Sequence, residues 1–258
     1  MTPIPDCIAE GQGEVVLFLH GVGGGADSWR PQISEFSRNY LAAAWNMPGY
    51  GKSILSGGMT FPELAASLEA LLDDRGWERV HLVGHSMGGM VAQEFAVAHQ
   101  DRLASLTLSA TSPAFGRPDG DFQKKFVEAR LAPLAAGKTM EDLARELVET
   151  MMSPGADPAG RQLAFDCMAQ VPAETYRAAV ECIVTFEQRA NLPMIRVPTL
   201  VIAGETDTNA PAPMMARMAE KIPGARYVCL PGLGHLANLE DPAAFDAVLA
   251  DFIAGAKA

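Results

Sequence analysis

Residues 82–90 read Leu82-Val83-Gly84-His85-Ser86-Met87-Gly88-Gly89-Met90, and they join an apolar, β-rich run to a segment with helical periodicity. Ser86 therefore lies in a very tight turn between a strand and a helix. A β-carbon at Gly84 or Gly88 would strike the neighbouring strand or helix, so glycine is needed at both positions. The pattern predicts a nucleophile elbow, with a strained serine and with the first helical N–H groups pointing toward its hydroxyl.

Strands and helices alternate along most of the chain. The expected strands are residues 15–19, 41–45, 79–83, 103–108, 198–204 and 225–230. The expected helices are residues 26–38, a helix from Thr60, and residues 90–98, 214–222 and 242–254. This alternation predicts the α/β class, with a mostly parallel, doubly wound sheet.

The alternation is interrupted once, after the strand that follows the elbow helix. Four amphipathic helices are expected here, at residues 122–136, 139–152, 157–170 and 172–189. We therefore expect a core formed by residues 1–114 and 193–258, with residues 115–192 inserted as a helical lid. Because the mouth above Ser86 is the available apolar surface, the lid should cover it. Its removal should still leave the sheet and the catalytic residues able to assemble.

Composition and charge exclude several classes of function. The chain has 258 residues and a formal net charge of −11, without a stripe of Lys and Arg, which argues against nucleic-acid binding. The four cysteines have neither CxxC spacing nor a partner histidine, so we expect no disulfide and no metal. No segment has the length of a membrane span and no secretory signal is evident, which predicts a cytoplasmic protein. A monomer and a homodimer both remain open.

Two further motifs resemble nucleotide-binding loops but lack essential parts. The glycine-rich loop at residues 20–25 follows a strand, as in a dinucleotide fingerprint, yet no acidic residue ends the next strand at Trp45. Gly51-Lys52-Ser53 ends like a P-loop, but Asn46 occupies the position of its first glycine. We therefore expect no nucleotide and no other cofactor.

Two more candidate residues follow the last two strands. Asp207 comes after Gly204, and His235 ends the motif Gly232-Leu233-Gly234-His235. With Ser86, each candidate stands just beyond the carboxyl end of a parallel strand, where open α/β sheets place their sites. Asp207 has the alternative role of a helix N-cap, and His235 that of a buried structural histidine.

The chain order Ser86, Asp207, His235 resembles the α/β-hydrolase superfamily over nearly the whole sequence. Within it, the motifs are similar to those of 3-oxoadipate enol-lactonases, cofactor-free haloperoxidase-type esterases and meta-cleavage C–C hydrolases. The resemblance implies that Ser86 is the nucleophile, that His235 is the base and that Asp207 orients it. It also implies an oxyanion hole formed by the backbone N–H groups of Val22 and Met87.

The chain departs from this family pattern at two places. The family usually has an antiparallel hairpin before its first parallel strand, but only about a dozen residues precede Val15, so we expect one edge strand to be missing. Meta-cleavage C–C hydrolases often carry Asn before the nucleophile, where this chain has His85. That difference argues against C–C cleavage.

Side chains with candidate substrate-binding roles are spread over the loops and the lid. They are Gly23, Trp29, Phe115, Met140, Phe186 and Arg189, with core packing the alternative for the apolar ones and a solvated ion pair that for Arg189. We expect His20 and His85 to hold loops through side-chain hydrogen bonds. His81 and His99 are expected at the surface.

The function that this sequence favours is hydrolysis of a small ester, lactone or related acyl compound through an acyl-enzyme. One alternative is C–C hydrolysis, which turnover of a dienoate but not of simple esters would distinguish. Another is a ligand sensor on a hydrolase scaffold, which very slow turnover and strong stabilisation by ligand would indicate. Dehalogenases and epoxide hydrolases are disfavoured because members of those families use Asp where Ser86 stands.

Overall fold

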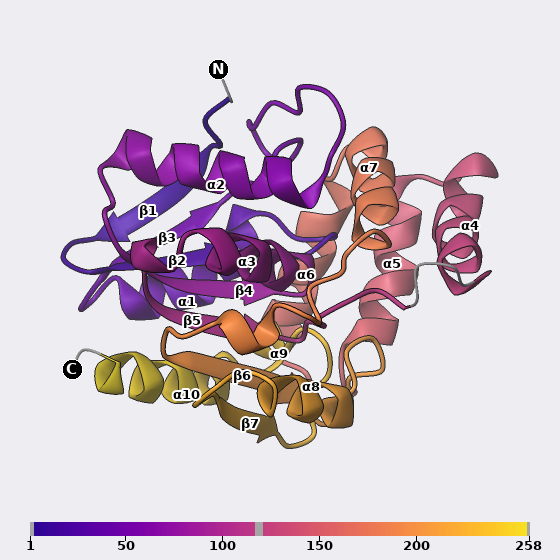
Figure 1. Ribbon diagram of the computed structural model, residues 1–258. Coiled ribbons are helices and arrows are strands. Elements are labelled where there is room, and N and C mark those ends of the chain that lie inside the picture. Colours follow the sequence, from indigo (N-terminus) through magenta and orange to yellow (C-terminus); the bar gives the residue numbers. More distant parts are fainter. Residues whose placement is uncertain (1–2, 117–120, 257–258) are drawn as a thin grey trace.

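A computed structural model describes residues 3–116 and 121–256 of the chain (Figure 1). Residues 1–2 and 257–258 belong to the expected core, and residues 117–120 belong to the expected lid. All of them lie outside the described residues.

The centre of the fold is a seven-stranded sheet with the order β1-β3-β2-β4-β5-β6-β7. Its strands are β1 (Cys7–Gly11), β2 (Val15–Leu19), β3 (Leu41–Trp45), β4 (Val80–His85), β5 (Leu103–Ser109), β6 (Thr199–Gly204) and β7 (Arg226–Leu230). Only β1 runs antiparallel to its neighbour, and the other pairings are parallel. The doubly wound sheet is therefore confirmed, and a single antiparallel strand precedes the first parallel one, as the short N-terminal segment predicts.

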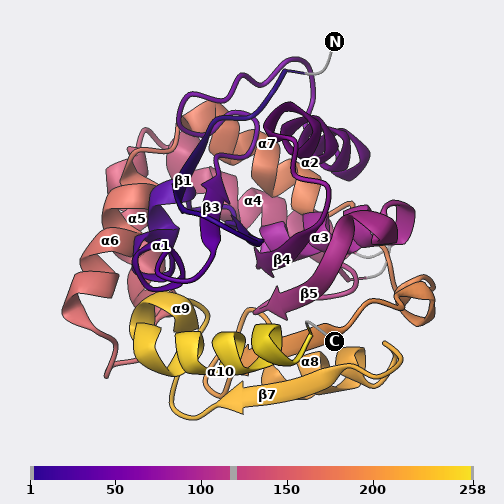
Figure 2. The same cartoon turned by 90° about the vertical axis from the view of Figure 1, so that its left-hand side faces the viewer.

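Helices cover both faces of the sheet (Figures 1 and 2). The side chains of β2 show why, since Leu17 and Leu19 belong to one apolar cluster and Val16 and Phe18 to the other. The first cluster includes residues of α2 (Phe61–Arg75), α3 (Met87–Ala98) and α8 (Ala212–Ala219), and the second residues of α1 (Arg30–Phe36) and α10 (Pro242–Gly255). The shorter helices are η1 (Ala26–Trp29), η2 (Gln100–Arg102), η3 (Leu192–Met194) and α9 (Ala237–Glu240).

Four helices lie between β5 and β6 in the chain, and we call them the four-helix segment. They are α4 (Asp121–Ala135), α5 (Met140–Met151), α6 (Pro158–Ala169) and α7 (Ala173–Ile183). The segment stands beyond one end of the sheet (Figure 1), although β5 and β6 pair directly with each other. The fourth helix was expected to reach residue 189, but it ends at Ile183, and Glu187 beyond it forms a β-bridge with Ala114.

Three expectations about individual residues can now be compared with the fold. His81 was expected at the surface but is 2% exposed, because β4 is a central strand covered on both faces, and its Nδ1 lies 2.8 Å from Ser105 Oγ. His99 is partly exposed and lies 3.3 Å from a Glu69 carboxylate oxygen. The four cysteines are free thiols. In the ranges 3–116 and 121–256, none of the helices combines the length and apolar character that crossing a bilayer requires.

A buried carboxyl group joins the two helices on one face of the sheet. Asp246 of α10 is 8% exposed, and its Oδ1 accepts a hydrogen bond of 3.0 Å from Gln32 Nε2 of α1. Burial raises the pKa of Asp246 to about 7, well above the ordinary value for an aspartate. Below about pH 7, the native state therefore favours the protonated form of Asp246.

We predict that this carboxyl makes the protein less stable as the pH rises from about 4 to about 7. Because the folded pKa is the higher one, the folded state binds more protons in this range, and each pH unit removes at most about 1.4 kcal/mol of unfolding free energy. Asp246→Asn should abolish this contribution. The unfolding free energy of the variant should therefore increase relative to that of the wild type as the pH rises. Urea unfolding at pH 5 and pH 8 measures the difference, and Asp251→Asn is the exposed control on α10. Parallel profiles for wild type and Asp246→Asn would contradict the prediction.

Candidate active site

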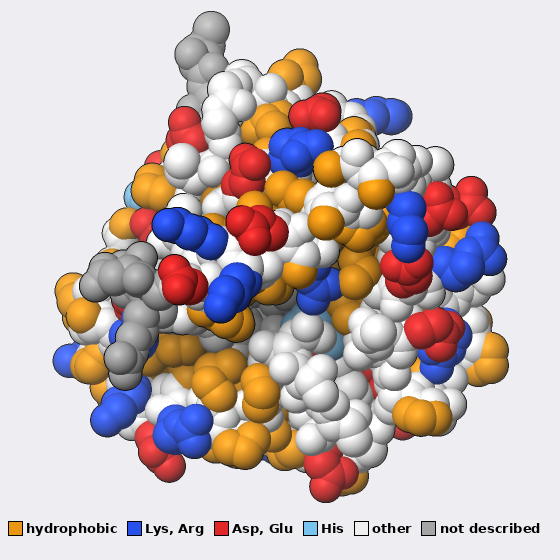
Figure 3. Space-filling view, turned by 90° about the vertical axis from the view of Figure 1, so that its right-hand side faces the viewer, with side chains coloured by type: hydrophobic (Ala, Val, Ile, Leu, Met, Phe, Trp, Pro, Cys, Tyr) orange, Lys and Arg blue, Asp and Glu red, His pale blue; other side chains and the backbone are white. Residues whose placement is uncertain are grey.

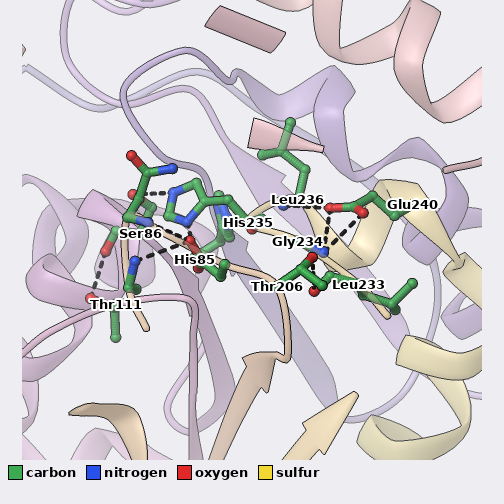
Figure 4. Close-up of polar contacts among 12 residues, drawn as sticks. His85, Ser86, Thr111, Thr206, Leu233, Gly234, His235, Leu236 and Glu240 are labelled. Atoms are coloured by element: carbon green, nitrogen blue, oxygen red, sulfur yellow. Dashed lines mark hydrogen bonds and ion pairs between the residues drawn. The ribbon is translucent and has the colours of Figure 1, made fainter. Parts of the chain in front are cut away.

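Ser86 occupies the turn between β4 and α3 with a positive φ of 52°, which is rare for residues other than glycine. Close contacts at both glycines explain why this turn excludes side chains, since a β-carbon on Gly88 would lie 2.3 Å from the Leu19 carbonyl oxygen and one on Gly84 2.5 Å from that of Gly88. The serine backbone is held on both sides. Its N–H donates to the Ser109 carbonyl at 2.9 Å, and its carbonyl accepts from Thr111 Oγ1 at 2.7 Å (Figure 4).

The three candidate residues form one hydrogen-bonded chain. His235 Nε2 lies 3.2 Å from Ser86 Oγ, and His235 Nδ1 lies 2.8 Å from Asp207 Oδ2. The ring of His235 lies beside Ser86 in Figure 4. The side chain of Asp207 is fully buried and that of His235 is 8% exposed. They come together because β4, β6 and β7 are parallel, which places the residues that follow these strands at one edge of the sheet.

Asp207 uses its two carboxylate oxygens differently. Oδ1 accepts from the N–H groups of Asn209 at 2.7 Å and Ala210 at 3.0 Å, and this leaves Oδ2 for His235. Burial opposes ionisation, but the hydrogen bond and charge of His235 and the two backbone donors outweigh it and hold the pKa of Asp207 below its ordinary value. The N-cap alternative does not apply, because α8 begins only at Ala212 and its N-cap residue is Pro211.

His20 and His85 hold the surrounding loops, as expected. His20 Nε2 accepts from the Met47 N–H at 3.0 Å, and its Nδ1 lies 2.8 Å from the Gly21 carbonyl oxygen. His85 Nε2 lies 2.8 Å from the carbonyl oxygen of His235. Burial lowers the pKa of His20 to about 4, and burial together with the charge of His235 lowers that of His85 to about 3. Both rings are therefore neutral near pH 7.

Glu240 is a functional candidate that the sequence analysis did not identify. This 3% exposed carboxylate accepts hydrogen bonds from the N–H groups of Gly234, at 3.0 and 2.9 Å to its two oxygens, and Leu236, at 3.1 Å (Figure 4). These groups flank His235 in the chain, so Glu240 fixes the loop that carries it. The sequence offers only a faint signal, an acidic residue that ends the largely apolar run from Leu236 and precedes Asp241-Pro242.

The same loop is joined to the four-helix segment. The N–H of His235 donates to the Met151 carbonyl at 2.8 Å, and the Ser153 N–H donates to Glu240 Oε2 at 2.8 Å. Removing residues 115–192 would therefore remove two groups that hold the loop of His235. This geometry argues against the expectation that the catalytic residues assemble without the lid.

A cavity of about 710 Å³ lies above Ser86 and His235, between the sheet edge and the four-helix segment. Four of the candidate residues, Val22, Gly23, Trp29 and Phe115, are among those that line it. The loop after β2 lies directly against the serine, since a β-carbon on Gly21 would be 2.9 Å from Ser86 Cβ. Figure 3 shows a hollow on this face, with a histidine side chain at its base, hydrophobic side chains around it and Lys or Arg side chains near its rim.

Two of the expected substrate-binding residues lie outside the cavity lining, and a third lines it but has an ion-pair partner. Met140 is 8% exposed and packs in the core, because the cavity is lined by the other end of α5, at Leu147, Val148 and Met151. Phe186 packs 4.6 Å from Phe61, centroid to centroid, since it lies past the end of α7 and outside the cavity lining. Arg189 lines the cavity, but its guanidinium forms an ion pair with Glu187 and is half exposed.

The chain belongs to the alpha/beta hydrolase fold family, whose model matches residues 14–242. This assignment agrees with the strand order and with the chain order of the three candidate residues.

Several relatives and solved structures that resemble this chain are named as hydrolases, esterases or lactonases. The chain is 29% identical over 248 residues to the "Putative carbamate hydrolase RutD" of Azorhizobium caulinodans, which covers 94% of this chain and 92% of the relative. Among solved structures, a thermophilic esterase from Thermogutta terrifontis is 26% identical with a TM-score of 0.88, covering 98% of this chain and 94% of that one. The enol-lactonase from Burkholderia xenovorans LB400 is 26% identical with a TM-score of 0.86, and the match covers 97% of this chain and 96% of that one.

We predict that Glu240→Gln destabilises the protein by about 1–3 kcal/mol, because the new amide group faces backbone donors and leaves at least one buried N–H unpaired. Glu205→Gln is the matched control, since exposed Glu205 accepts from Gly232 in the same loop at 2.8 Å and its loss should cost less than about 0.5 kcal/mol. Urea unfolding of both variants gives the comparison. Equal losses would show that Glu240 has no special part in holding the loop.

Proposed function

We propose that the protein is a serine hydrolase that cleaves a small ester, lactone or related acyl compound through an acyl-enzyme. The observation that carries this proposal is the hydrogen-bonded chain from Ser86 Oγ through His235 to Asp207, placed at the base of a cavity. In this proposal Ser86 is the nucleophile, His235 is the general base and acid, and Asp207 orients the imidazole.

The proton transfers follow from the geometry. His235 Nδ1–H donates to Asp207, so the unprotonated Nε2 takes the Ser86 proton as the serine oxygen attacks the acyl carbon. The imidazolium then gives this proton to the leaving group, and the acyl-enzyme forms. Water attacks the acyl carbon in the second half, with His235 first removing a water proton and then returning it to Ser86 Oγ.

The developing oxyanion needs donors that are already in place. We assign this role to the backbone N–H groups of Met87, the first residue of α3, and Val22, which lines the cavity beside the serine. Tyr50 supports the second donor, because its Oη donates to the Val22 carbonyl at 2.6 Å and so fixes the loop. In this proposal the two donors come from the residues that follow β2 and β4.

In this proposal the lid spans residues 115–192, and the four-helix segment forms the greater part of it. The lid is inserted between two parts of one core, residues 1–114 and 193–258. Helices α4 to α7 supply much of the cavity lining, so the lid should exclude water and select the substrate. The named relatives include an esterase, an enol-lactonase and a carbamate hydrolase, and in all three compound classes the attacked carbon is an acyl carbon. This agreement supports acyl transfer more strongly than C–C cleavage.

Replacing the proposed nucleophile tests the mechanism directly. We predict that Ser86→Ala lowers kcat toward p-nitrophenyl acetate by several orders of magnitude while the thermal midpoint stays near that of the wild type. A fluorophosphonate should label Ser86 and no other serine, with Ser112→Ala as the control because Ser112 also lines the cavity. A Ser86→Ala variant with more than about a tenth of the wild-type kcat would exclude this residue as the nucleophile.

Asp207→Asn should lower kcat by a factor on the order of 10⁴, as the triad mechanism requires. The amide oxygen can still accept from Asn209 and Ala210, so the amide NH₂ would face His235 Nδ1 and impose the tautomer whose Nε2 carries the proton. Such a histidine cannot accept the serine proton. Steady-state kinetics across pH 5–9 measures the loss, and nearly unchanged activity would show that another acid orients His235.

A further inference from the structure

Arg130 is a cation inside the cavity that the proposed mechanism does not use. It comes from α4, is partly buried, and lines the same cavity as Ser86 and His235. Its guanidinium carbon lies 5.2 Å from the centroid of the Phe126 ring, which also lines the cavity. The aromatic contact orients the guanidinium without neutralising its charge.

The phenol of Tyr176 stands beside Arg130. Tyr176 belongs to α7, is 1% exposed, and contributes to the cavity lining. Burial raises the pKa of this phenol, and the adjacent guanidinium only partly offsets the effect, so the group keeps its proton near pH 7. Arg130 and Tyr176 therefore present a cationic donor and a neutral O–H donor to the same space.

No carboxylate among the described residues forms an ion pair with Arg130. Arg189, the other arginine in the lining, is already paired with Glu187. This difference is notable in a chain with a net charge of −11, because acidic side chains pair with most of the other arginines that the structure describes. A partly buried cation without a counter-ion is stabilised when a ligand supplies the negative charge.

We propose that Arg130 and Tyr176 bind a carboxylate of the substrate, so that the compound hydrolysed at Ser86 is an ester or lactone carrying a second, ionised carboxyl group. This inference rests on the proposed function and narrows its substrate class. The carboxylate belongs to either the acyl part or the leaving group. In both cases it anchors the substrate at the α4 and α7 side of the cavity while the acyl carbon meets the serine.

Matched pairs of substrates test the anchor. For the acyl side, we compare the p-nitrophenyl monoester of adipic acid with that of adipamic acid, which replaces the carboxylate by a neutral amide. For the leaving-group side, we compare 4-acetoxybenzoate with 4-acetoxybenzamide. A charge-assisted hydrogen bond to arginine predicts that the wild type prefers the anionic member of at least one pair by about 10- to 100-fold in kcat/KM.

Arg130→Gln should remove this preference, and Arg130→Lys should retain part of it, because lysine keeps the charge but not the fork of donors. Arg145→Gln is the matched control, since Arg145 also lies over a phenylalanine, 5.6 Å from the Phe165 centroid, but is outside this cavity lining. Its preference should equal that of the wild type. Equal rates for both members of both pairs, or a preference that persists in Arg130→Gln, would overturn the proposal.

A binding measurement separates failure of this anchor from failure of the proposed function. In Ser86→Ala protein, calorimetric titration with monomethyl adipate and with methyl adipamate reports binding without turnover. We expect the acid to bind at least tenfold more tightly, and the additional substitution Arg130→Gln to remove the difference. Selective binding in a protein whose wild type hydrolyses none of the esters would keep the anchor and reject the hydrolase. Ester hydrolysis with equal binding of acid and amide would keep the hydrolase and reject the anchor.

Discussion

The positive φ of Ser86 is the constraint on which the rest of the site depends. A non-glycine residue in this region costs about 1–3 kcal/mol, so the surrounding structure must hold it there. The Ser86 N–H donates to the Ser109 carbonyl and the Thr111 hydroxyl donates to the Ser86 carbonyl, which supplies part of this support. The close approach of Gly88 to the Leu19 carbonyl fixes the start of α3. The serine consequently stands just beyond β4, where the loops after β6 and β7 bring the other two candidates.

The sequence predicted the fold and the central geometry well, because both depend on local patterns. Buried β-branched runs define the strands, and the motifs around Ser86, Asp207 and His235 each follow one of them. Long-range packing was less accessible. His81 was expected at the surface, and only the position of β4 in the middle of the sheet shows that both faces of this strand are covered. Met140 and Phe186 were predicted to bind substrate but lie outside the cavity lining, for a related reason. Periodicity shows which face of a helix is apolar, but it does not show which neighbour that face meets.

Contacts between distant segments were the part of the site that no sequence pattern revealed. Glu240 reads as an ordinary acidic residue before a helix, yet it is buried and accepts from both N–H groups that flank His235. Its partner Ser153 lies 87 residues away in the chain. Arg130 presents the same difficulty, because only the folded arrangement shows that no carboxylate in the ranges 3–116 and 121–256 forms an ion pair with it.

The link between the histidine loop and the four-helix segment uses backbone atoms on the side of the segment. The Met151 carbonyl is present whatever side chain that position carries, and the donor at position 153 is present for every residue except proline. Point substitutions in the cavity wall can therefore change which compounds fit without displacing His235. A one-residue insertion or deletion at Met152 would change the spacing between these two groups. Evolution of new specificity on this scaffold is consequently open to changes of side chain in that stretch, whereas changes of its length are constrained.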